Sequence, residues 1–127
     1  VHAALGLPLL GANLPVRQAI DVIGNAAVHV GGRWHLGIFA ATGGTPTVAL
    51  SANNHKMHSL MRQLRMDAPV FDALQVERHI DAIVAQAGRY LEAGAPLRER
   101  LLQRSRELGA EVGHNMDFVR RLAGSPS

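Results

Sequence analysis

Hydrophobic positions in the first part of the chain change from helical spacing to strand-like runs. From Pro15 to Ile23 the apolar residues recur at helical spacing, and Gly24 with Asn25 ends that run. The stretch Ala26–Val30 is apolar apart from His29, as in buried parallel strands. The pattern therefore predicts a helix followed by a buried strand. Residues 1–14 are apolar with glycine and proline interruptions, which predicts a short strand or a connector.

The alternation of helix and strand continues after Gly31 and Gly32. Arg33–Thr42 carries large apolar side chains among small ones, as expected for a helix packed closely on a sheet. Gly43-Gly44-Thr45-Pro46 breaks this helix, and Thr47–Leu50 reads as the next strand. The segment is therefore one β-α-β unit.

A second helical unit follows a polar turn. Asn53 or Asn54 is placed to cap a helix over Lys56–Leu64, whose apolar residues share one face. Ala68–Phe71 is a candidate edge strand.

The rest of the chain is predicted to be helical. Gln75–Leu91 has apolar residues at intervals of three and four, Gly94-Ala95-Pro96 interrupts the pattern, and Leu97–Leu122 forms a second long helix. The order of elements predicts an α/β fold, with a Rossmann-like parallel sheet and a helical C-terminal cover over about residues 75–122.

Length and composition fit one globular domain. The chain has 127 residues, of which 47% are hydrophobic and 18% charged. Its net charge of +3 is mild, and the arginines from Arg89 to Arg121 alternate with acids and apolar residues, which indicates solvated helix faces and not a nucleic-acid surface. With no cysteine, disulfides and thiol chemistry are excluded. No apolar run is long enough for a membrane helix. Since the chain starts without Met and without a signal pattern, we expect a piece of a larger protein.

The strand–helix junctions hold the candidate chemistry. Arg33 and His35 follow the first strand, and Lys56 follows the second. In a parallel sheet both junctions lie at the carboxyl edge, where helix N-termini favour anions. A guanidinium binds phosphate or carboxylate through a fixed fork of donors, and an imidazole is a candidate general acid. An interpretation of equal weight is that Arg33 is a surface cation and that His35 is a hydrogen-bonded interior residue.

Other polar residues allow weaker hypotheses. Ser51 and Asn54 lie in the loop after the second strand, where they add neutral donors to an anion site or only form the turn. His55 and His58 are three residues apart, but without an acidic or thiol partner nearby we expect no metal site. The glycine fingerprint of dinucleotide-binding proteins is absent, and so are paired carboxylates with hydrolase-like spacing.

One part of the chain combines several short motifs in a fixed order. It begins with Gly31-Gly32-Arg33-Trp34-His35 and continues with an apolar helix that ends in Gly44-Thr45-Pro46, then a strand, then His55-Lys56. This order of motifs resembles the C-terminal half of the polysaccharide pyruvyl transferases. The likeness covers roughly residues 15–122. It implies transfer of a pyruvyl group from phosphoenolpyruvate to a glycan or lipid-linked saccharide as a ketal, with phosphoenolpyruvate as donor substrate and no cofactor. It also implies that residues 1–127 are one Rossmann-like C-terminal domain, half of a glycosyltransferase-B-like two-domain architecture whose N-terminal domain is not in this chain.

The resemblance also implies roles for individual residues. Arg33 would hold the phosphate or carboxylate of phosphoenolpyruvate, His35 would be catalytic by protonating its methylene carbon, and Lys56 would bind charge at the cleft. The expected location is the cytoplasm, the inner face of the membrane included.

Two alternative functions stay open. One is the donor domain of a glycosyltransferase that uses nucleotide sugars, which is disfavoured because no acid lies on the strand–helix edge between Asp21 and Asp67. The other is a non-catalytic anion-binding module.

Overall fold

The computed structural model describes residues 5–124, apart from the side chains of Asn115, Met116, Phe118 and Val119. Its elements are, in chain order, α2 (Val16–Gly24), β1 (His29–Gly31), α3 (Trp34–Thr42), β2 (Thr47–Ser51), α4 (Lys56–Gln63), β3 (Val70–Asp72), the 3-10 turn η1 (Ala73–Gln75) and α5 (Val76–Gly124). The α/β class, the parallel sheet and the helical C-terminal cover are therefore confirmed. Within residues 5–124, none of the helices has the length and apolar character needed to cross a bilayer. Part of the stretch predicted as a short strand or connector, residues 1–4, lies outside the described residues, and 5–14 contains no strand.

The three strands pair in the order β1-β2-β3, all parallel. β2 matches the predicted strand with one residue added, whereas β3 starts two residues later than predicted. β1 begins three residues late, because the carbonyl of Ala26 does not pair with a strand. It accepts instead from the hydroxyl of Thr45 at 2.9 Å and from the guanidinium of Arg98. The stretch before His29 is therefore a loop held by side chains.

Glycines let the helices α2, α3 and α4 pack closely. A Cβ on Gly37 would lie 2.6 Å from Cδ2 of Leu60, so a small residue in α3 leaves room for α4. A Cβ on Gly43 would lie 2.3 Å from the Cα of Gly24, where the ends of α2 and α3 meet. The apolar core lies between α3, α4, the sheet and α5, and it includes Val48, Met57, Leu60, Phe71 and Leu101.

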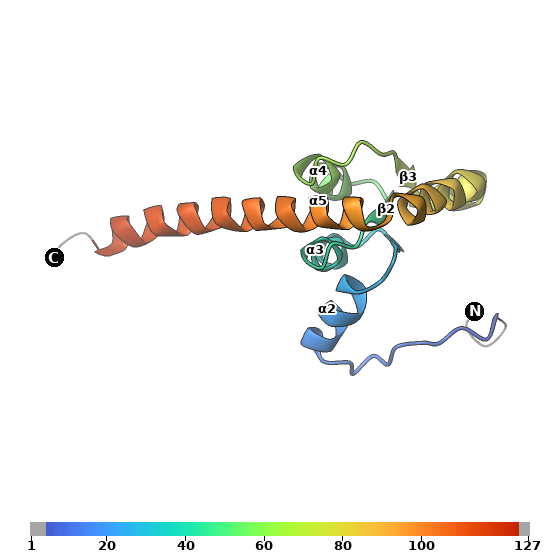
Figure 1. The fold of residues 1–127 in the computed structure, drawn as a ribbon, viewed down its shortest axis with the longest axis horizontal. Helices are drawn as coiled ribbons and strands as arrows, with labels where there is room; N and C mark the ends of the chain where they lie inside the picture. Colours follow the sequence, from blue (N-terminus) through green and yellow to red (C-terminus); the bar gives the residue numbers. More distant parts are fainter. Residues whose placement is uncertain (1–4, 125–127) are drawn as a thin grey trace.

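α5 changes direction at Gly94, where the sequence predicts a break. Gly94 has φ 57° and ψ −139°, a conformation that glycine adopts at little cost, and Pro96 follows it. The chain is helical on both sides, so α5 consists of two helices that meet at Gly94, and the predicted break is confirmed. In Figure 1 the part after the kink, drawn in orange to red, passes α3 and α4 and extends beyond them toward the C-terminus.

The part of α5 after the kink contacts the C-terminal ends of the other helices. Arg98 Nη1 donates to the carbonyls of Gly24 in α2 and Gly43 after α3, and Arg104 Nε donates to Gln63 at the end of α4. Helix ends leave carbonyls without partners, and cations there are stabilising. The prediction that these arginines are solvated is therefore wrong for Arg98 and Arg104, and the Arg104 side chain is only 13% exposed. In a parallel sheet joined by helices, these ends lie at the amino edge, so α5 closes that edge.

Candidate functional site

Arg33 and His35 lie at the open carboxyl edge, at the start of α3. Arg33 has extended backbone (φ −90°, ψ 121°) and is the residue before the first turn, where no side chain caps the helix. Both side chains are exposed, and the ring of His35 meets Trp34 edge to face with centroids 5.1 Å apart. Among the described residues, the Arg33 guanidinium has no hydrogen bond or ion pair. The interpretation of His35 as an interior residue is therefore wrong, and both groups are available to a ligand.

Lys56 is the first residue of α4 and is also exposed. Gly31 pairs with Ala49 in the parallel register, so β1 and β2 end at the same edge, and the residues that follow them lie along it. The Lys56 ammonium forms no ion pair with the described residues. The structure thus brings Arg33, His35 and Lys56 to one edge of the sheet, on two adjacent helix N-termini.

Ser51 and Asn54 build the turn between β2 and α4. The Ser51 hydroxyl donates to the carbonyl of Asn54 at 2.8 Å. The Asn54 carboxamide accepts from the backbone N–H of Lys56 at 3.1 Å and donates to the carbonyl of Ala52. The N-cap of α4 is His55 and no side chain caps it, so the prediction that Asn53 or Asn54 caps this helix is wrong; Asn54 instead stabilises the turn before the cap. The role of Ser51 and Asn54 as ligands of an anion stays a prediction, since the turn already engages their donors.

A polar pocket of about 490 Å³ lies between the carboxyl ends of β2 and β3. Its polar lining comes from Ser51, Asn53, Asn54, His55, His58 and Asp72. Asp72 was not a candidate in the sequence, although its position at the end of a strand was a usable signal. Its carboxylate accepts from the N–H of Leu74 at 2.9 Å. The rings of His55 and His58 are 6.5 Å apart, and within residues 5–124 no three His, Asp or Glu side chains form a group suited to a metal.

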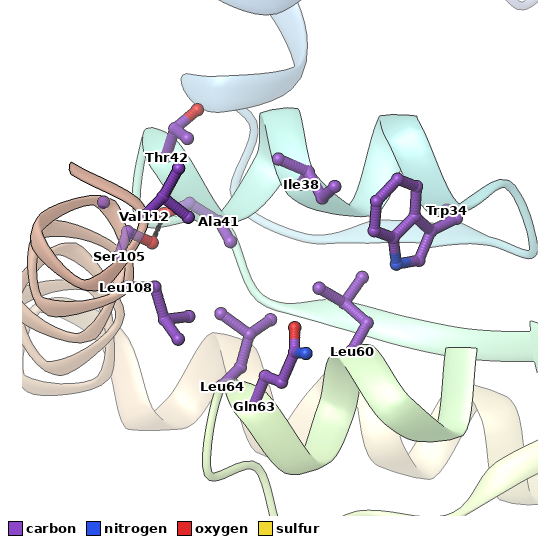
Figure 2. A pocket seen from close by; sticks show the side chains of 11 residues that line it. Trp34, Ile38, Ala41, Thr42, Leu60, Gln63, Leu64, Ser105, Leu108 and Val112 are labelled. Atoms are coloured by element: carbon purple, nitrogen blue, oxygen red, sulfur yellow. Dashed lines mark hydrogen bonds between the residues drawn. The ribbon is translucent and has the colours of Figure 1, made fainter. Parts of the chain in front are cut away.

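A second pocket, of about 320 Å³, lies between α3, α4 and α5 and is apolar (Figure 2). Trp34 and Ile38 line it from α3, Leu60 from α4, Leu64 from the residue that follows α4, and Leu108 with neighbouring residues from α5. No charged side chain is among its lining residues, so it suits an apolar group and not a phosphate. This pocket was not predicted, because each of these residues also fits an ordinary core position.

His29 does not belong to the site. It is half-buried in β1, with Nδ1 3.2 Å from the hydroxyl oxygen of Thr47. Burial lowers the pKa of its imidazole. Its role is therefore structural.

The open edge thus presents a guanidinium, an ammonium and an imidazole together with helix N-termini. Such a set can bind an anion and transfer a proton, and in this part of the chain no paired carboxylates of a hydrolase accompany it. Comparison with protein-family models, with curated proteins and with solved structures gives no match to this chain.

Proposed function

We propose that this chain is the phosphoenolpyruvate-binding half of a polysaccharide pyruvyl transferase. One observation carries the proposal: Arg33, His35 and Lys56 are all exposed on the carboxyl edge of a parallel sheet, while α5 occupies the opposite edge. The order of these residues along the chain is also that of the family that the sequence resembles. The donor is a small molecule with a phosphate and a carboxylate, and it needs cations of this kind.

The residues have distinct tasks in the proposed reaction. The guanidinium of Arg33 and the N–H groups in the first turn of α3 bind the phosphate or the carboxylate. His35 donates its proton to the methylene carbon, which becomes a methyl group and leaves the neighbouring carbon electron-poor. One sugar hydroxyl adds to that carbon, phosphate leaves, and a second hydroxyl closes the ketal. The hydroxyl protons go to the imidazole and to the departing phosphate, and Lys56 balances charge as the phosphate departs.

The acceptor glycan binds outside this chain in this proposal. A second domain, packed on the N-terminal side as in glycosyltransferase-B-like proteins, would close over the carboxyl edge and contribute the acceptor contacts. The expected location is the cytoplasm or the inner face of the membrane.

The experiment uses the full-length protein that contains this chain. It measures phosphate release from phosphoenolpyruvate with a glycan acceptor and detects the ketal methyl group by NMR. In D₂O the product should carry a singly deuterated methyl group. His35→Gln and Arg33→Gln should each abolish ketal formation, and Arg17→Gln, an exposed arginine on α2, should react normally. Normal turnover by His35→Gln would overturn the assignment in favour of a non-catalytic anion-binding module.

A glycosyltransferase that uses a nucleotide sugar is the second candidate, and Asp72 favours it. This carboxylate lines the polar pocket at the end of β3, so the edge does carry an acid outside the stretch considered from the sequence. An acid at this edge can bind the hydroxyls of a ribose. Binding of a nucleoside diphosphate that Asp72→Asn removes, with no reaction of phosphoenolpyruvate, would support this candidate.

A further inference from the structure

A third pocket, of about 460 Å³, lies at the kink of α5, away from the carboxyl edge. One wall is the connection from α4 to β3, with Arg65 and Asp67, and the other is α5 on both sides of Gly94. This connection leads into the amino end of β3. The pocket shares no lining residue with the polar pocket at the carboxyl edge.

The pocket has an excess of positive charge. Arg65, Arg89 and Arg100 line it, and Asp67 is the one carboxylate among its lining residues. Nη1 of Arg65 lies 3.9 Å from Oε2 of Glu107, at the outer limit of an ion pair, and the Arg65 side chain is 71% exposed. Arg100 makes no hydrogen bond or ion pair with any described residue. Three guanidinium groups with fewer carboxylates than cations around them repel one another, so an anion in this pocket would be stabilising.

Tyr90 lines the same pocket, and its hydroxyl is buried without a hydrogen-bond partner. Tyr90 is 6% exposed, and its hydroxyl is the one buried side-chain polar atom of the described residues that makes no hydrogen bond. Gln86 is the polar neighbour of this hydroxyl and acts on its pKa, but its Oε1 accepts from Nη2 of Arg89 at 2.6 Å and no bond of hydrogen-bond geometry joins Gln86 to Tyr90. A buried donor without an acceptor costs free energy, and such groups usually mark a missing water, ion or ligand.

The Tyr90 hydroxyl is suited to donate and not to ionise. Burial raises the pKa of the phenol, while the Gln86 side chain and the positive charges of Arg89 and Arg100 act in the opposite direction. At neutral pH the phenol therefore keeps its proton and can offer it to an acceptor oxygen.

We propose that this kink pocket binds a phosphate monoester, with Arg65, Arg89 and Arg100 around the phosphate oxygens and Tyr90 donating its hydroxyl. Guanidinium forks match the tetrahedral oxygens of a phosphate and form charge-assisted hydrogen bonds with them. The site is separate from the proposed donor site, because it lies near the amino end of the sheet. The phosphate belongs to a soluble monoester or to a lipid headgroup, which present the same chemistry.

The experiment titrates the full-length protein with inorganic phosphate and with phenyl phosphate by calorimetry. All variants carry Arg33→Gln, so that the carboxyl edge does not contribute. Arg100→Gln and Tyr90→Phe should each weaken binding, by about tenfold for the loss of a charge-assisted bond. Arg106→Gln, an exposed arginine elsewhere on α5, is the matched control and should bind as the parent does.

Thermal unfolding separates lost binding from a lost fold. Phosphate should raise the Tm of the Arg33→Gln parent and of Arg106→Gln, and not that of Arg100→Gln. Cosedimentation with vesicles that contain phosphatidic acid, lost in Arg100→Gln, would identify a lipid headgroup, and saturable phenyl phosphate binding without cosedimentation would identify a soluble ester. Equal phosphate affinity in Arg100→Gln, Tyr90→Phe and Arg106→Gln would overturn the proposal.

Discussion

The Nη1 atom of Arg98 donates to the carbonyl oxygen of Gly43 at 2.7 Å, so a cation of α5 lies on the last turn of α3. The same guanidinium reaches Gly24 and Ala26, which are more than seventy residues away in sequence. One side chain therefore joins α2, the loop before β1, α3 and α5. This junction orders the start of β1, and with it the strand that leads to Arg33.

Replacing Arg98 with Ala should destabilise the whole domain. Three carbonyls would lose a charged donor in a partly buried place, which should lower the free energy of unfolding by about 3 kcal/mol. Urea denaturation followed by circular dichroism measures the change. Arg106→Ala, on the same helix but exposed, should cost less than about 0.5 kcal/mol, and equal effects of the two substitutions would contradict this role for Arg98.

Gly43 and Gly88 should respond to alanine in opposite directions. A Cβ at Gly43 would lie 2.2 Å from the carbonyl oxygen of Gly24, so the ends of α2 and α3 would have to separate, with a loss of about 2 kcal/mol or more. Gly88 is inside α5 and a Cβ there meets nothing within 4 Å, so alanine should stabilise the helix by about 0.5–1 kcal/mol. Midpoints of urea unfolding for the two variants test both signs.

Stability should fall in mild acid because of His29. Burial lowers the pKa of this imidazole in the folded state, so below about pH 6.5 the unfolded chain binds a proton that the folded chain does not. The loss develops as the pH falls from about 6.5 toward the lower pKa of the folded state. Unfolding midpoints measured between neutral and acidic pH should show a shallower slope for His29→Gln than for the parent. Parallel curves would show that another group causes the acid dependence.

Substitutions of Lys56 and Asn54 should affect different properties, phosphoenolpyruvate binding for Lys56 and the free energy of unfolding for Asn54. Lys56→Gln removes an exposed charge and should change the free energy of unfolding by less than about 0.5 kcal/mol while weakening phosphoenolpyruvate binding. Asn54→Ala removes the hydrogen bond from the N–H of Lys56 and should cost about 1 kcal/mol of stability. Paired denaturation and binding measurements on the full-length protein distinguish the two. A stability loss in Lys56→Gln as large as in Asn54→Ala would indicate that Lys56 is structural.

The sequence predicted elements whose patterns are local. The helices over 16–24, 34–42 and 56–63 and the strand β2 follow from apolar spacing and from glycine and asparagine signals, and so does the break at Gly94. The start of β1 was missed because Arg98, far along the chain, binds the carbonyl that a strand would have used.

Part of the site was predictable because it also follows from local patterns. Arg33, His35 and Lys56 follow strands directly, so their edge could be inferred from the order of elements. Asp72 and the cluster around Tyr90 were not foreseen, because they depend on contacts between segments distant in sequence. Spacing along the chain carries no information about such contacts.

The parallel sheet has a consequence for how the domain folds. β1 and β2 pair His29 with Thr47, 18 residues away, and no hairpin brings them together early. Closing that interval costs chain entropy that the pairing alone does not recover, so strand pairing must accompany docking of α3. The transition state should therefore already contain the contact between α3 and β2, and substitutions there should slow refolding more than they speed unfolding.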